Sequence, residues 1–125
     1  MTGANRGIGL ELCRQLKTQG HQVTAICRNS SAELDQLELT VIEHTDVANL
    51  DSVQQLAAQL KGQQFDVLIN NAAIFTTLDM KPFYEIDLDE WRDVINVNLN
   101  GVYQCSRQVV DAMRHKGFCL SLIHI

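Results

Sequence analysis

Proline and aromatic residues are scarce in this sequence. Its 125 residues contain one proline, and only 6% are aromatic. Such a composition excludes a collagen-like chain or a proline-rich linker. Hydrophobic residues make up 46% and charged residues 20%, as in ordinary globular proteins. A length of 125 residues allows one globular domain at most.

Long apolar runs and basic clusters are also missing. No stretch reaches the roughly 20 apolar residues that span a bilayer, and the N-terminus does not resemble a signal peptide. The formal net charge is −5. We therefore expect neither a membrane nor a nucleic acid as partner.

Cysteine is present, but without the spacing of a metal site or a disulfide framework. There is no C-x-x-C pair and no histidine cluster. We therefore expect buried thiols in a reducing cytoplasm, and no metal ion. The cysteines are Cys13, Cys27, Cys105 and Cys119.

A glycine-rich stretch stands at the start of the chain. Gly3, Gly7 and Gly9 follow the spacing G-x-x-x-G-x-G, and an amphipathic helical pattern begins directly behind them. A glycine turn that leads into a helix presents unpaired amide groups, and the helix dipole favours negative charge. Glycine also lets the backbone approach where a Cβ would collide. The pattern indicates a phosphate site, and a surface loop with three glycines is the alternative.

Strand and helix patterns alternate behind this turn. The alternation favours a parallel sheet with helices on both faces, the doubly wound α/β class. The first helix is expected to stop at Gly20, and Asn49 or Asp51 can cap a later helix that ends at Gly62. The expected strands are 22–27, 39–44 and 65–69, with a short helix near 31–37 and a long one from 88 to about 116.

Four motifs in register resemble the short-chain dehydrogenase/reductase family, over residues 2 to about 117. They are Thr-Gly-Ala-Asn-Arg-Gly-Ile-Gly at 2–9, Thr-Asp-Val at 45–47, Asn-Asn-Ala-Ala at 70–73 and Asn-Val-Asn-Leu at 96–99. The first motif, with Cys-Arg-Asn at 27–29, is most similar to the C-factor and carbonyl-reductase-like branch. The resemblance implies a Rossmann-like fold. It also implies an NAD(P)H-dependent oxidoreductase that transfers a hydride between the nicotinamide and a carbonyl or alcohol carbon of a small molecule.

The resemblance also implies cofactor contacts. Asp46 and Val47 would lie at the adenine, although a helix-capping or turn aspartate is the alternative for Asp46. Asn71 and Ala72 would pass close to a ribose, with turn chemistry as the alternative for the asparagine. Ala73 departs from the family, which has glycine there. The cofactor-binding candidates are Gly3, Asn5, Arg6, Gly7, Ile8, Gly9, Arg28, Asp46, Val47, Asn71 and Ala72.

The cofactor preference depends on the residues that end the 22–27 run. NAD enzymes of this fold usually place an acidic residue there for the ribose 2′-hydroxyl. Here Cys27 is followed by Arg28, which can bind a 2′-phosphate through paired, charge-assisted hydrogen bonds. Arg6 can approach the same phosphate. We therefore expect NADP rather than NAD, with a solvated loop charge as the alternative for Arg28.

Asn98 is the one catalytic candidate. By resemblance it is the asparagine of the family's catalytic tetrad, which holds a water beside the active-site lysine. An asparagine inside a helix is mildly unfavourable, so we expect its side chain to bind a water or stabilise a kink.

Tyr84 and Tyr103 lack a lysine four residues later, so neither matches the family's general acid. We expect no reductase activity from the chain as written. The alternatives are a non-catalytic dinucleotide sensor or signalling module, and a fragment that does not fold alone.

The predicted domain is truncated at both ends. Only Met1 precedes the glycine turn, so we expect the first strand of the sheet to be absent. The second and fourth strands, at 22–27 and 65–69, would then lack their common partner. The C-terminal catalytic half, with its serine, tyrosine and lysine, is also expected to be missing. We interpret 1–117 as a partial NAD(P)-binding domain and 118–125 as a non-native tail, an unusual fifth strand being the alternative. The parent protein is expected to be a homo-oligomer, because family members commonly pair through the helix that carries Asn98.

Overall fold

The computed structural model describes residues 1–74 and 82–114, so the expected tail at 118–125 lies outside the described residues. In this part of the chain two short strands alternate with helices. The elements are α1 (Gly7–Thr18), β1 (Thr24–Ile26), α2 (Ala32–Asp35), β2 (Thr40–Ile42), α3 (Leu50–Gln59), the 3-10 turn η2 (Phe83–Glu85), α4 (Leu88–Ile95), the π-helical segment η3 (Asn96–Asn100) and α5 (Gly101–Arg114).

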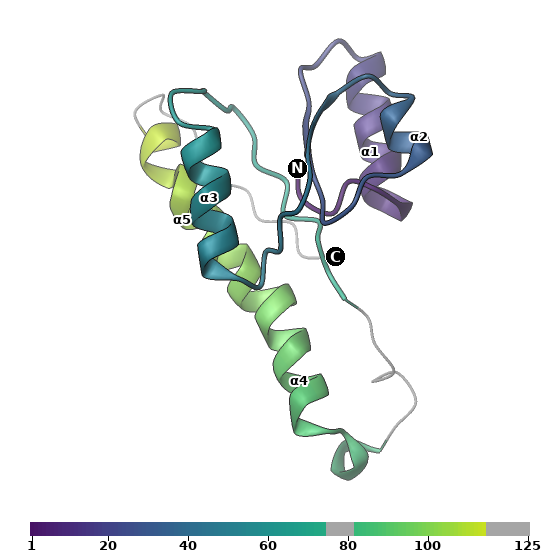
Figure 1. Cartoon of the computed structure of the whole chain (residues 1–125), viewed down its shortest axis with the longest axis vertical. Coiled ribbons are helices and arrows are strands. Elements are labelled where there is room, and N and C mark those ends of the chain that lie inside the picture. Colours follow the sequence, from purple (N-terminus) through teal and green to yellow (C-terminus); the bar gives the residue numbers. More distant parts are fainter. Residues whose placement is uncertain (75–81, 115–125) are drawn as a thin grey trace.

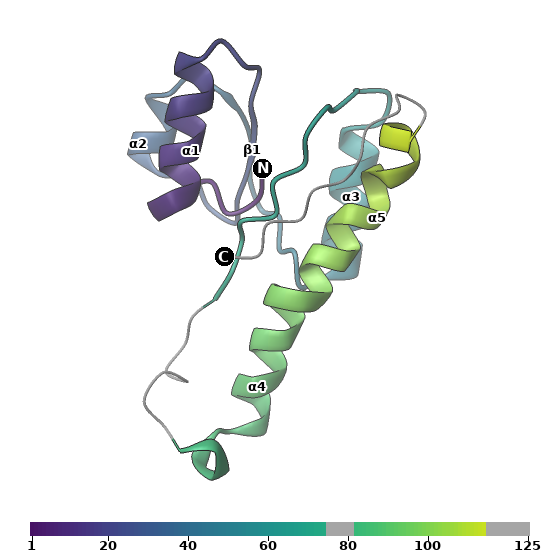
Figure 2. The same cartoon turned by 180° about the vertical axis from the view of Figure 1, so that it is seen from behind.

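The two strands pair in parallel, with Ala25 opposite Val41 and Ile26 opposite Ile42. Parallel strands need a crossover connection, and α2 lies within it. Helices α1 and α2 lie on one side of the strands and α3 and α5 on the other (Figures 1 and 2). This arrangement confirms the expected Rossmann-like, doubly wound α/β class.

Met1 and Thr2 lie where the central strand of such a sheet belongs. Thr2 forms a parallel bridge with Ile26, and the Ile26 amide donates to the Met1 carbonyl at 2.9 Å. On the other side, the Thr2 amide donates to the Ile69 carbonyl at 3.0 Å. The runs at 22–27 and 65–69 therefore share a partner at Met1 and Thr2, and the expectation that they lack one is wrong there.

The run at 65–69 does not form the expected strand. The Ile69 carbonyl accepts a backbone hydrogen bond from Thr2, but none of residues 65–69 belongs to a strand ladder. Its Val67 side chain is 70% exposed, although the apolar sequence predicts burial. A β-rich composition favours an extended chain, but a strand also needs a neighbour along its length.

The helix ends follow their predicted signals. The Asn49 side chain accepts a hydrogen bond from the Ser52 amide at 3.1 Å, so Asn49 and not Asp51 caps α3. A cap that was not predicted is Ser31, whose hydroxyl accepts from the Leu34 amide at 3.2 Å at the start of α2. Gly20 follows α1 with φ +85°, a conformation that glycine adopts without strain.

Two apolar cores lie on the two faces of the strands. The first joins α1, β1 and α2, and the second joins α3 and α5. The members of the first are Met1, Ala4, Cys13, Ala25, Cys27 and Leu34, and those of the second are Val47, Val53 and Cys105. Ala72 and Val97 each pack against the second core, which therefore supports the segment at 70–73 and the π-helical segment η3.

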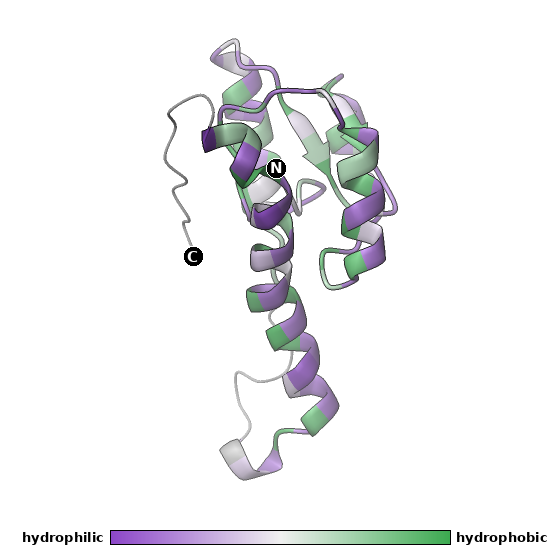
Figure 3. Cartoon of the chain, turned by 90° about the vertical axis from the view of Figure 1, so that its left-hand side faces the viewer, coloured by the Kyte–Doolittle hydropathy of each residue, from purple (hydrophilic) through white to green (hydrophobic). Residues whose placement is uncertain are grey.

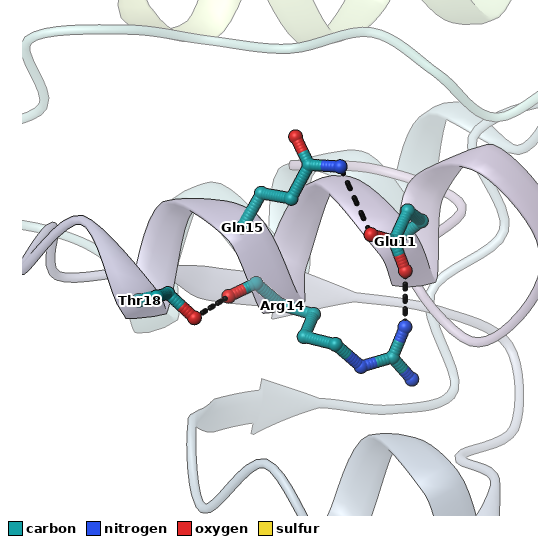
Figure 4. A network of polar contacts seen from close by, with 4 residues as sticks. All are labelled: Glu11, Arg14, Gln15 and Thr18. Atoms are coloured by element: carbon teal, nitrogen blue, oxygen red, sulfur yellow. Dashed lines mark hydrogen bonds and ion pairs between the residues drawn. The ribbon is translucent and has the colours of Figure 1, made fainter.

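The outer face of α1 is polar, in contrast to its buried Cys13. Gln15 donates to the Glu11 carboxylate at 2.9 Å, and Arg14 forms an ion pair with the same carboxylate (Figure 4). The Thr18 hydroxyl donates to the Arg14 carbonyl at 2.9 Å. Polar and apolar stretches alternate along the other helices as well (Figure 3). No helix among the described residues is long and apolar enough to cross a membrane.

The predicted long helix is confirmed over the described part, as α4, η3 and α5 in one continuous run. The π-helical segment at Asn96–Asn100 was not predicted. There the Gly101 amide donates to the Asn96 carbonyl, one residue further back than in an α-helix. Such π-helical turns occur frequently at functional sites.

Three cysteines confirm the expectation of buried free thiols: Cys13, Cys27 and Cys105. Cys119 lies outside the described residues. Burial raises the pKa of the Cys105 thiol to about 11, from an ordinary value of 9.0.

The buried Cys105 thiol makes stability depend on alkaline pH. In the unfolded chain it ionises near pH 9, whereas the folded chain keeps it neutral to about pH 11. Its contribution is therefore complete below pH 9 and is lost as the pH rises towards 11, by roughly 1–3 kcal/mol. Urea unfolding at pH 7.5 and 10.5 should show the difference in stability between the wild-type chain and Cys105→Ala shrinking at the higher pH. An unchanged difference would contradict this burial.

Candidate functional site

The three glycines of the turn have different structural roles. A Cβ on Gly3 would lie 2.7 Å from the Ala72 Cα, and Gly3 has φ +65°. A Cβ on Gly9 would lie 2.2 Å from the Gly3 carbonyl oxygen and 2.5 Å from the Asn71 Nδ2. At Gly7 the φ of +55° favours glycine, but no atom lies within 4 Å of a built Cβ. Gly3 and Gly9 thus permit close packing, whereas Gly7 shapes an open turn.

Thr2 fastens the turn to the segment at 71–72. Its hydroxyl oxygen accepts hydrogen bonds from the amides of Asn71 and Ala72, both at 3.1 Å, and the residue is only 2% exposed. In return, the Asn71 side-chain amide donates to the Gly3 carbonyl at 2.9 Å and to the Thr2 carbonyl at 3.3 Å. Thr2 was not among the predicted site residues, although it opens the glycine motif.

The N-terminus of α1 opens on this turn. Arg6 is the cap residue, and its side chain makes no capping hydrogen bond. The first amide to bond back along the helix is that of Leu10, which donates to the Arg6 carbonyl at 3.3 Å. The amides of Gly7, Ile8 and Gly9 precede it, and the first turn contains no acidic residue. Arg6, Gly7 and Ile8 are exposed, so the helix end presents donors and positive potential to an anion.

The loop after β1 lies against the glycine turn. The Ala4 amide donates to the Ile26 carbonyl at 3.3 Å, and the Ser31 hydroxyl donates to the Asn5 carbonyl at 2.8 Å. These contacts bring the loops of Arg6 and Arg28 together. Both arginines are exposed, and neither forms an ion pair with a carboxylate of residues 1–74 or 82–114. The structure thus leaves two cations available beside the turn.

Asp46 and Val47 differ in their surroundings. The Asp46 side chain is exposed and accepts from the Ala48 amide at 2.9 Å, the turn geometry that was the alternative for this residue. Val47 is 8% exposed and belongs to the core. A Cβ on Gly101 would lie 2.9 Å from its Cγ2, so α5 approaches Val47 closely.

Asn98 lies in the π-helical segment and binds the backbone of Ile74 twice. Its Nδ2 donates to the Ile74 carbonyl at 3.0 Å, and its Oδ1 accepts from the Ile74 amide at 2.9 Å. The amide side chain therefore fastens η3 to the segment that follows Asn71 and Ala72. This reciprocal contact between residues 24 positions apart was not predicted from the sequence.

The structure therefore brings most of the predicted residues into one region. Gly3, Gly9, Asn71 and Ala72 are in direct contact, and the loops of Arg6 and Arg28 are joined through Asn5 and Ser31. Chemically, the region offers the backbone amides at the start of α1 and the two arginine cations to an anionic ligand.

Comparison with known proteins agrees with this geometry. The sequence model of the family described as short chain dehydrogenase matches residues 1–119. Acetoacetyl-CoA reductase of Allochromatium vinosum is 33% identical over 94% of this chain and 51% of its own length. NADP-dependent 3-hydroxy acid dehydrogenase YdfG of Salmonella typhimurium is 29% identical over 98% of this chain and 52% of its own length.

Solved structures agree as well. The closed form of serine dehydrogenase complexed with NADP+ superposes with a TM-score of 0.84 at 27% identity, over 97% of this chain and 51% of that one. The chain thus spans about half the length of the relatives it matches. The family match covers nearly all of the chain and includes all four motifs. The chain therefore belongs to the short-chain dehydrogenase/reductase family of oxidoreductases, as its motifs predict.

Proposed function

We propose that this chain binds NADP(H) at the glycine turn, within a protein that reduces a small-molecule carbonyl or oxidises the matching alcohol. The observation that carries the proposal is the N-terminus of α1, whose glycine turn is locked against 71–72. The amides of Gly7, Ile8 and Gly9 would bind the pyrophosphate. The bound cofactor supplies or accepts the hydride, while the chain holds and orients it.

The remaining proposed contacts follow the motifs. We assign Asp46 and Val47 to the adenine, and Asn71 and Ala72 to a ribose. Ala72 packs against the core cluster that contains Val47, which supports neighbouring positions for these groups. Asn98 is proposed to support the proton relay of the whole protein. Its double hydrogen bond to Ile74 would place that backbone at the edge of the reaction site.

The proposed preference is for NADP over NAD. Arg6 and Arg28 support it, because each is exposed and makes no ion pair within the described residues. A relative named as NADP-dependent and a superposable structure with NADP+ bound also support it. At the end of β1, an arginine rather than an acidic residue favours a 2′-phosphate.

An Arg28→Ala variant tests this preference. It should bind NADP+ about 10- to 100-fold more weakly, because charge-assisted hydrogen bonds to the phosphate are lost, and NAD+ affinity should not change. Isothermal titration with both cofactors measures the two dissociation constants. The matched control is Arg107→Ala, which removes an exposed arginine from α5. Equal losses for NADP+ and NAD+, or no loss for either, would contradict the assignment.

Three further features of the protein are proposed. The opening motif and Cys27-Arg28-Asn29 support a place in the C-factor and carbonyl-reductase-like branch. Buried free thiols support a cytoplasmic location. The long helix supports a homo-oligomer, because apolar side chains along it remain exposed. These are Leu88, Trp91, Leu99 and Tyr103, at 59%, 45%, 61% and 64% exposure.

A further inference from the structure

Two carboxylates converge on Ser30, in the loop between β1 and α2. The Ser30 amide donates to the Glu43 Oε1 at 2.6 Å, and the Ser30 hydroxyl donates to the Asp35 carboxylate. Glu43 follows β2, and Asp35 ends α2. Both hydrogen-bond donors of Ser30 are therefore occupied by anions that belong to the protein itself.

This loop is where the cofactor's 2′ group belongs in a doubly wound fold, at the end of the second strand of the sheet. Ser30 lies two residues after Arg28, and the next residue, Ser31, is hydrogen-bonded to the glycine turn through the Asn5 carbonyl. Cys27, at the start of the loop, is also close to both carboxylates. Burial first, and then the charges of Glu43 and Asp35, raise the pKa of its thiol.

The loop therefore combines opposing charges around one subsite. Arg6 and Arg28 attract a 2′-phosphate, while Asp35 and Glu43 repel it and occupy the Ser30 donors that could otherwise bind it. A 2′-hydroxyl carries no charge and is not subject to this repulsion. Removal of one carboxylate charge should thus change the affinity for one cofactor and not for the other.

We infer that Glu43 and Asp35 are specificity-determining residues that weaken the chain's preference for NADP over NAD. The inference rests on the proposed cofactor site. It predicts a chain that accepts both dinucleotides, with the arginines and the carboxylates in opposition. A purely structural role for the two carboxylates, in which they only order the loop, predicts no change in the ratio of the two affinities.

The test is Glu43→Gln in the intact chain. Glutamine keeps an oxygen that can accept from the Ser30 amide, so the substitution removes charge while preserving the loop contact. The NADP+ dissociation constant should fall by about threefold or more at low salt, with less change at high salt, and that of NAD+ should not move. Asp35→Asn should act in the same direction. Glu33→Gln is the charge-matched control, because Glu33 is an exposed carboxylate on α2 and the Ser30 donors go to Glu43 and Asp35 instead.

The outcomes separate this inference from the proposed function. An unchanged ratio of NADP+ to NAD+ affinity in both variants, with cofactor binding intact and equal far-ultraviolet circular dichroism, would overturn the inference alone. An equal gain in Glu33→Gln would also overturn it, because the effect would then be one of net charge. If the wild-type chain bound neither dinucleotide, the proposed function itself would fail.

Discussion

A Gly9→Ala variant is expected to lose NADP+ binding by at least about 100-fold and to lose about 3 kcal/mol or more of folding stability. The added Cβ would lie 2.2 Å from the Gly3 carbonyl oxygen and 2.5 Å from the Asn71 Nδ2. The carbonyl belongs to the backbone of the turn, so a side-chain rotation cannot relieve the collision. Isothermal titration and urea unfolding measure the two losses.

Gly20→Ala provides the matched control for this variant. Gly20 has φ +85°, but no atom lies within 4 Å of a built Cβ. It follows α1 at the end away from the glycine turn. The left-handed backbone should cost about 1 kcal/mol, and NADP+ binding should be retained. Equal losses of binding in the two variants would show that general destabilisation, and not the packing of the turn, controls the site.

A Thr2→Val variant is expected to lower the free energy of unfolding by about 2–4 kcal/mol, because two amides lose their acceptor. Valine has nearly the shape of threonine, so the packing around this buried side chain is kept. The amides of Asn71 and Ala72 would remain without the hydroxyl oxygen that now accepts from both at 3.1 Å. Urea unfolding measures the change, and NADP+ affinity should fall with it, because the segment at 71–72 is released from the turn.

Thr2→Ser is the control that separates the hydroxyl from the methyl group. Serine keeps the acceptor and loses only the buried methyl, which should cost about 1 kcal/mol. If valine and serine lowered the free energy of unfolding equally, the two hydrogen bonds would contribute nothing measurable to stability. The proposed locking of the turn by the Thr2 hydroxyl would then be wrong.

Local chemistry explains why much of the fold could be predicted. A helix stop such as Gly20 or a cap such as Asn49 acts on residues within one turn, so its signal lies in adjacent sequence. The glycine spacing likewise identified the turn at the N-terminus of α1. The choice between Asn49 and Asp51 stayed open because both residue types cap helices, and only the position of the Ser52 amide decides it.

Contacts between distant segments explain what could not be predicted. The predicted strand at 65–69 is absent from the structure, because β-propensity does not reveal whether a partner strand runs alongside. The hydroxyl of Thr2 acts on amides 69 and 70 positions away, and Asn98 acts on Ile74 across 24 positions. Nothing in the local sequence around Ser30 indicates that Glu43, 13 positions later, occupies its amide.

The most direct test of the account is to observe the backbone amides while NADP+ is added. In a two-dimensional amide NMR spectrum of the labelled chain, the signals of Gly7, Ile8 and Gly9 should shift most, because these amides at the start of α1 would donate to the pyrophosphate. NAD+ should shift the same three signals, whereas the signals of the loop at 28–30 should respond more strongly to NADP+. Large shifts confined to other elements, or none at millimolar NADP+, would contradict a dinucleotide site at the glycine turn.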